Sequence, residues 1–354
     1  MLQWFSMQYF YKWRAFLLPF FLFSILLVSG AFFYLFFSLN YPGIGEDIHA
    51  VWRSGMELSE HKDPYRHILE TDMLHPNGAK FPTYLPGPYY FAAATSELFG
   101  LNTFEEWILV YKKILLIFTL GVAGLIFYIH FNRRDDLLLC VFGAMFWLFN
   151  RWTIKNMEIY HIDIPALFFL ILSLSMLGRR NAYSFLLYGV SLSIKQVGAL
   201  MFPLYLFEFY KIFRKEKMHA IGLLLLGVYV PLVLCIPFLI KNPKTIFLSL
   251  IFHLTRAPEE WFNAPSFDAY ITWKYPFLLG ATSKPFLIIL LIIFYIYAFR
   301  SKLGKYSTAF CVFSIFIFFN TVLFPQYFVW NIPFITLAIT EICSKHKKDN
   351  SGSN

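Results

Sequence analysis

Two neighbouring carboxylates, Glu46-Asp47, follow a turn at residues 41–45, directly after the first long apolar run of the chain. A carboxylate held beside a hydroxyl can act as a general base and take its proton while the oxygen attacks another centre. A phosphate leaving group needs no acid, so one essential carboxylate suffices, whereas glycoside hydrolases use two. The alternative is a solvated acidic turn, because charged loop residues are mostly exposed.

Lys195 is the most informative cation, because it separates two apolar runs at 182–194 and 197–210. At membrane depth an ionisable residue costs about 2.5–3.5 kcal/mol on insertion scales. Its ammonium either extends to the membrane surface or binds a phosphate at a helix break. Other cations that could bind the same anion are Arg53, Arg66, Arg151 and Lys155.

A third polar group is His161-x-Asp163, preceded by Glu158, at the start of an apolar run. Histidine and carboxylate ligands can share one face and bind a metal, but no third ligand has a helpful spacing. We therefore expect no cofactor, with a divalent metal as the less favoured alternative. A packed histidine with a capping carboxylate, or a contact to a substrate, is the preferred interpretation.

Two aromatic segments accompany these residues. Asp63-Pro64-Tyr65 and Tyr84 belong to proline-containing stretches that precede a short helix, and they serve either as structural caps or as substrate contacts. Gln326-Tyr327 and Trp330 lie where an aromatic belt at a membrane surface is expected, although stacking on a sugar is also open. The chain has no P-loop, GxGxxG, HExxH or GxSxG motif, so an activated donor is expected to be lipid-linked.

The composition decides which kind of scaffold must position these residues. The chain has 354 residues, of which 58% are hydrophobic and 14% charged, against about 45–50% and about 25% in soluble domains. This excludes a soluble enzyme, a disordered protein and a fibrous protein. The four cysteines lie in apolar stretches and form no disulfide framework or zinc pattern. We predict an all-α polytopic membrane protein.

Hydropathy and charge predict about ten membrane spans. The first apolar run is too long for a signal peptide and is expected to stay as a span. The lysines and arginines between runs place both termini on the cytoplasmic side, which explains the net charge of +9 through contact with anionic lipid and not with nucleic acid. The predicted spans are 16–39, 107–131, 137–149, 162–178, 182–194, 197–210, 219–240, 285–299, 306–324 and 327–343.

The whole chain, 1–354, is expected to form one integral membrane domain. It would include an outer loop at 40–106, with an interfacial or re-entrant helix at 85–99, and a basic cytoplasmic tail at 344–354. With this topology most of the polar residues discussed above lie on the outer face. His49, in the first outer loop, is a further candidate for substrate binding there. We predict a site near the outer membrane surface.

The order of these motifs resembles that of GT-C-class membrane glycosyltransferases, and most closely the bacterial polyprenyl-phosphate-mannose-dependent mannosyltransferases. The similarity covers roughly the first 210 residues and includes the later segment Gly189-x5-Lys195. The loop at 62–80 is longer and more polar than the family pattern. The resemblance implies an inverting hexosyltransferase in which Asp47 is the base, with Glu46 next to it. From the residues themselves we hypothesise that Glu46 supports this base and that Lys195 binds the donor phosphate together with an arginine of the first or second outer loop.

The resemblance also implies the partners: a polyprenyl-phosphate sugar as donor, and a lipid-linked glycan or similar hydroxyl as acceptor. A transporter or flippase of lipid-linked sugars is the alternative. Transporters commonly have related halves, and this chain shows no clear internal repeat. A non-catalytic assembly subunit would make Glu46 and Asp47 dispensable.

Overall fold

The computed structural model describes residues 2–38, 45–70, 82–133, 135–255, 270, 274–275, 283–320 and 323–351, and these contain helices and no strand. The outer-loop segments at 39–44 and 71–81 and most of the loop at 256–282 lie outside the described residues. The helices are α1 (Leu2–Phe33), η1 (Tyr34–Ser38), α2 (Glu46–Ser59), η2 (Pro64–Glu70), α3 (Gly87–Phe99), α4 (Phe104–Asn132), α5 (Leu137–Leu148), α6 (Arg151–Glu158), α7 (Asp163–Met176), α8 (Asn181–Ile194), η3 (Gln196–Met201), α9 (Phe202–Phe213), α10 (Lys217–Lys241), α11 (Pro243–Thr255), α13 (Ser283–Arg300), α14 (Lys305–Phe319), η5 (Pro325–Trp330) and α15 (Ile332–Ser351).

Each predicted apolar run coincides with a helix, but the predicted count of about ten spans is not supported. Among the described residues, three helices are long and apolar enough to cross a membrane: Leu17–Phe36, Phe104–Asn132 and Lys217–Lys241. A fourth span is possible if the bent pair α5–α6 acts as one. The other apolar helices are shorter than the roughly 20 residues that a full crossing needs. The protein is thus an all-helical protein with several helices able to span a membrane.

Two polar residues show why the apolar runs break into short helices. The side chain of Asn150 caps the first turn of α6 by accepting from the backbone N–H of Trp152 at 2.9 Å, so the chain bends by 41° between α5 and α6. Lys195 has extended backbone angles, φ −151° and ψ 126°, which end α8 before η3 begins. The apolar runs that end at these breaks form helices too short for a full crossing, so counting each run as a span overestimates the number of spans.

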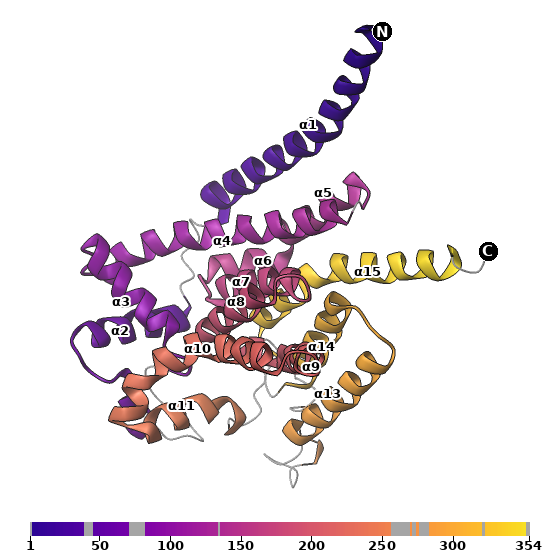
Figure 1. Cartoon of the computed structure of the whole chain (residues 1–354). Helices are drawn as coiled ribbons and strands as arrows, with labels where there is room; N and C mark the ends of the chain where they lie inside the picture. Colours follow the sequence, from indigo (N-terminus) through magenta and orange to yellow (C-terminus); the bar gives the residue numbers. More distant parts are fainter. Residues whose placement is uncertain are drawn as a thin grey trace.

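The helices pack around a central group formed by α7, α8 and α10, with α4 lying along α5 on one side of it (Figure 1). Helix α1 rests on α4 and α5 and then extends away from the other helices (Figure 1). Helices α2 and α3 pack against each other near the start of α4. The predicted outer loop at 40–106 thus contains α2, η2 and α3, while α15 continues through most of the predicted tail.

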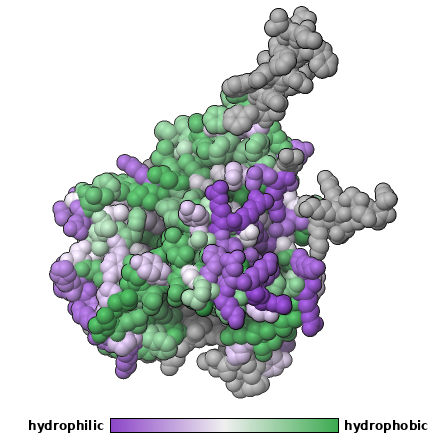
Figure 2. All heavy atoms as spheres, in the orientation of Figure 1, coloured by the Kyte–Doolittle hydropathy of each residue, from purple (hydrophilic) through white to green (hydrophobic). Residues whose placement is uncertain are grey.

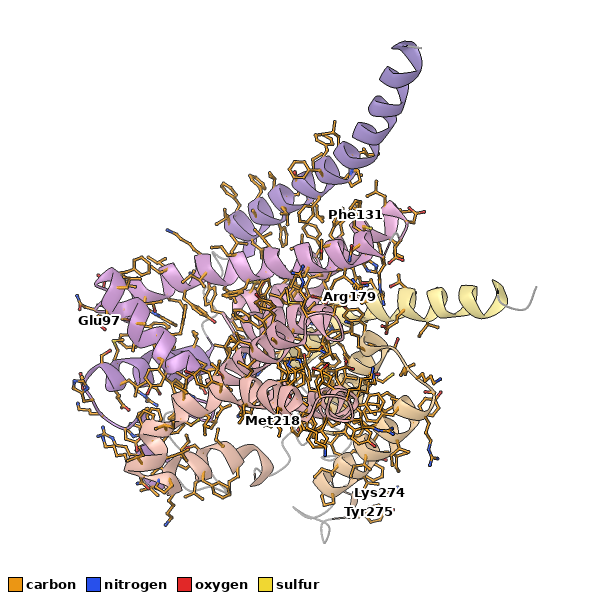
Figure 3. The ribbon with its side chains drawn as sticks, viewed as in Figure 1. Glu97, Phe131, Arg179, Met218, Lys274 and Tyr275 are labelled. Carbon is orange, nitrogen blue, oxygen red and sulfur yellow. The ribbon has the colours of Figure 1, made fainter. Side chains whose placement is uncertain are left out.

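Hydrophilic residues are spread unevenly over the surface of the molecule. In Figure 3, Glu97 lies at the left edge, on α3, and Arg179 lies nearer the middle of the view. Figure 2 shows hydrophilic side chains gathered over the middle and right of this face, with apolar side chains covering much of the remainder. Arg133, at the end of α4, forms an ion pair with Glu341 of α15 at 3.2 Å, which joins the two helices. Which side faces the cytoplasm remains a prediction.

Candidate active site

Asp47 lies in the first turn of α2 and is buried, with 7% of its surface exposed. The buried face of α2 also carries Ile48, Ala50, Val51 and Ser54, at helical spacing. The Oη of Tyr84 donates to Asp47 Oδ2 at 2.8 Å, and His161 Nε2 lies 2.5 Å from the same oxygen. The acidic side chain that sequence reasoning placed in a loop is therefore held inside the protein.

Three more ionisable residues continue this chain of contacts. Nδ1 of His161 lies against Oδ2 of Asp163, and Nζ of Lys195 donates to that oxygen at 2.7 Å. Lys195 Nζ is 3.5 Å from His161 Nδ1. We call Asp47, His161, Asp163 and Lys195 the buried charge cluster. It connects α2, the start of α7 and the break after α8.

Aromatic side chains enclose the cluster. The indole N–H of Trp330 donates to Oδ1 of Asp163, and Trp330 is fully buried. The ammonium of Lys195 lies 5.5 Å from the ring centre of Tyr84 and 5.8 Å from that of Tyr327, within cation–π range. Trp330 was expected in a membrane-surface belt, and its burial corrects that expectation: the indole N–H finds its acceptor in the core.

Tyr84 is fixed at its backbone before its side chain reaches Asp47. Its carbonyl accepts from the Oη of Tyr65 at 2.7 Å, and its N–H donates to the Oη of Tyr89 at 3.0 Å. Asp63 accepts from the backbone N–H of Tyr65 at 3.0 Å. The predicted substrate residues Asp63 and Tyr65 thus orient Tyr84 and are themselves buried.

A close approach of two backbones brings the Lys195 break to this segment. A Cβ at Gly87 would overlap the carbonyl oxygen of Ser193, so only glycine allows α3 and α8 to meet here. Next to it, Gln196 Nε2 donates to the carbonyl of Thr83 at 2.7 Å. These contacts hold Lys195 beside Tyr84.

Burial and charge act against each other at Lys195, which has 4% of its surface exposed. Burial lowers the pKa of Lys195, while the neighbouring Asp163 favours its ammonium and limits the shift. Lys195 was predicted as a phosphate ligand. In the structure its ammonium is already engaged by Asp163, so phosphate binding by Lys195 would require opening a buried ion pair.

The other predicted residues lie outside the cluster. Glu46 and His49 are exposed, and the His49 ring stacks on Phe104 with centroids 3.7 Å apart. Arg66 and Arg151 are exposed, and the Arg151 guanidinium lies 5.3 Å from the ring centre of Trp152.

Three predicted side chains occupy intermediate positions. Arg53 is half-buried on α2, and Gln326 and Tyr327 are half-buried on η5. The backbone carbonyl of Gln326 accepts from Asn156 at 3.4 Å. No metal-binding group of three His, Cys, Asp or Glu side chains occurs among the described residues.

Sequence reasoning missed Tyr111 and Thr83. Tyr111 comes from α4 and interacts electrostatically with Asp163, and its Oη has no hydrogen-bond partner within the described part of the chain. Thr83 Oγ1 is likewise buried without a partner there. Tyr111 lies in an apolar helix and Thr83 stands next to Tyr84, so nothing in the neighbouring sequence indicates that either residue lies near the cluster.

No protein-family model matches this chain, and no curated protein is significantly similar to it in sequence. The site must therefore be interpreted from its own geometry. That geometry offers a buried carboxylate, fixed by a phenol and an imidazole, at one end of a cluster whose cationic groups are also buried.

Proposed function

We propose that this protein is an inverting membrane glycosyltransferase that moves a hexose, with mannose the first candidate, from a polyprenyl phosphate to an acceptor hydroxyl. The acceptor would be a lipid-linked glycan or similar molecule on the outer membrane face, with both termini cytoplasmic. The observation that carries the proposal is Asp47: a buried carboxylate oriented by Tyr84 and His161 in a protein rich in apolar helices.

In the proposed reaction the acceptor oxygen attacks the anomeric carbon while its proton passes to Asp47. The new carbon–oxygen bond forms as the bond to the phosphate oxygen breaks, and the phosphate departs with the electron pair. A single displacement inverts the anomeric configuration. The phosphate needs no proton to leave, so the site requires one base and no separate acid.

The donor phosphate is assigned to cations outside the cluster. Arg53 lies on α2, the helix that carries Asp47, Arg66 lies on η2, which contacts α2, and Arg151 begins α6, the helix before His161. Arginine can bind phosphate through paired N–H groups. Lys195 then serves mainly to balance the charge of Asp163.

The test is transfer by purified protein in proteoliposomes, with mannosyl-phospho-polyprenol and an acceptor extract. Asp47→Asn should lower turnover about 10²–10⁴-fold, since it removes a general base with little change of shape. The matched control is Glu97→Gln, which changes an exposed carboxylate on α3, outside the buried charge cluster. This variant should keep wild-type turnover. Wild-type turnover by folded Asp47→Asn would refute the base assignment.

One observation favours the transporter alternative. A buried Lys195–Asp163 pair sits at a broken helix, an arrangement that transporters use for substrate and ion sites. Labelled lipid-linked sugar that crosses vesicles without forming a glycosidic product would select this function over the transferase.

A further inference from the structure

Both ring nitrogens of His161 face carboxylate oxygens. Nε2 lies 2.5 Å from Asp47 Oδ2, and Nδ1 lies against Asp163 Oδ2. An ionised carboxylate can only accept hydrogen bonds, and a neutral imidazole has only one N–H to give. Both contacts are therefore satisfied when the ring carries hydrogen on both nitrogens.

The charges of the cluster lead to the same state. Lys195 pairs with Asp163 at 2.7 Å, so two carboxylates and one ammonium sum to one negative charge. Asp163 is fully buried and His161 has 2% of its surface exposed. An uncompensated charge at such a site is strongly unfavourable. An imidazolium at His161 makes the cluster neutral.

Four further groups with described contacts to the cluster are uncharged at neutral pH. They are the phenols of Tyr84, Tyr111 and Tyr327 and the indole of Trp330. They come from the segment before α3, from α4 and from η5. In the described contacts, the charged or titrating groups that lie directly against the His161 ring are Asp47, Asp163 and Lys195.

We propose that His161 is a positioning residue that rests as an imidazolium between Asp47 and Asp163. It keeps Asp47 ionised and fixed, while Asp163 and Trp330 hold the ring in place. The catalytic role of His161 in this proposal rests on the proposed transferase function, whereas the assignment of its charge state does not. When Asp47 takes the acceptor proton, the cluster gains one positive charge as the leaving phosphate gains its electron pair.

The first test is spectroscopic and independent of turnover. Nitrogen-15 histidine NMR of the full chain in nanodiscs should show, at pH 8, one ring with both nitrogens protonated. That signal should vanish in His161→Gln. It should shift in Asp47→Asn, and this shift assigns the signal to His161 independently if His161→Gln folds poorly. His67→Gln removes a more exposed histidine–carboxylate pair, with Glu57 at 2.8 Å, and should leave the signal in place. A neutral His161 ring at pH 8 would overturn the proposal.

The second test is a double-mutant cycle on thermal unfolding in detergent. His161→Gln leaves the cluster with one excess negative charge and Asp163→Asn with one excess positive charge, while the double variant is neutral. The double variant should therefore lose less thermal stability than the sum of the two single losses. Additive or larger losses would show a packing role only and overturn the proposal.

The pH profile of transfer links the charge state to catalysis. In wild type, turnover should fall at the pH at which the imidazolium signal disappears, and His161→Gln should lack this fall. A fall that persists in the variant contradicts the positioning role. If wild type shows the imidazolium but transfers no sugar, the transferase proposal fails and the charge assignment stands.

Discussion

Removing Lys195 gives the most direct test of how the cluster contributes to stability. Lys195→Met keeps much of the side-chain volume and removes the ammonium that lies 2.7 Å from Asp163. Asp163 would keep its contacts with His161 and Trp330 but lose its ammonium partner in a fully buried position. Breaking a buried pair by deleting one partner costs about 3–5 kcal/mol. Because Asp163 keeps two partners, we expect Lys195→Met to lower the free energy of unfolding by about 3 kcal/mol, near the lower end of this range.

The assay is equilibrium unfolding in mixed micelles, followed by circular dichroism and tryptophan fluorescence. Lys211→Met is the matched control, because Lys211 pairs with Glu208 at 3.1 Å but has 55% of its side chain exposed. An exposed pair is worth about 0.2–1 kcal/mol, so this variant should unfold almost like wild type. Adding Asp163→Asn to Lys195→Met should recover part of the loss, since the cluster regains neutrality. The reasoning is refuted if Lys195→Met and Lys211→Met are equally stable.

Three further variants test other parts of the site. Tyr84→Phe removes a hydrogen bond to a charged acceptor and should lower the unfolding free energy by about 1.5–3 kcal/mol in the same assay. Gly87→Ala should cost about 1–3 kcal/mol through overpacking, whereas Gly222→Ala, where a Cβ meets open space, should not destabilise α10. Burial lowers the pKa of Lys305 to about 8 from 10.5, so between these values the unfolded chain retains a proton that the folded protein has released. Stability should thus rise with pH across this interval, and comparison of melting curves should show that Lys305→Met lacks the rise.

Much of the fold could be predicted because composition and apolar runs report directly on helices. Every predicted run contains a helix, yet the count of about ten spans is not supported, because several runs were counted as spans on the basis of charge although their helices are short. Helices α5, α7, α8 and α9 have only 12, 14, 14 and 12 residues, fewer than the roughly 20 that a full crossing needs.

The site was predictable residue by residue but not as an arrangement. The isolated charges at Asp47, His161, Asp163 and Lys195 stand out against apolar sequence, and sequence analysis selected all four. Their pairing depends on contacts between residues far apart in the chain, since Asp47 and His161 differ by 114 in residue number. The prediction that Lys195 contacts phosphate followed from chemistry alone and did not anticipate that Asp163 would engage its ammonium.

The proposed neutral state of the cluster has consequences for how the proposed anionic donor would reach the site. Two carboxylates balanced by an imidazolium and an ammonium exert little net attraction on a distant phosphate, so recruitment falls to the arginines outside, such as Arg66 and Arg151, which are exposed. Attraction between exposed charges is screened by salt within about 10 Å at 0.1 M. The buried charges, by contrast, act only over the short distances inside the cluster. Donor capture should therefore depend on ionic strength, while the basicity of Asp47 should not. Attraction of the donor and proton transfer would thus be carried out by charges in different places, the first exposed and the second buried.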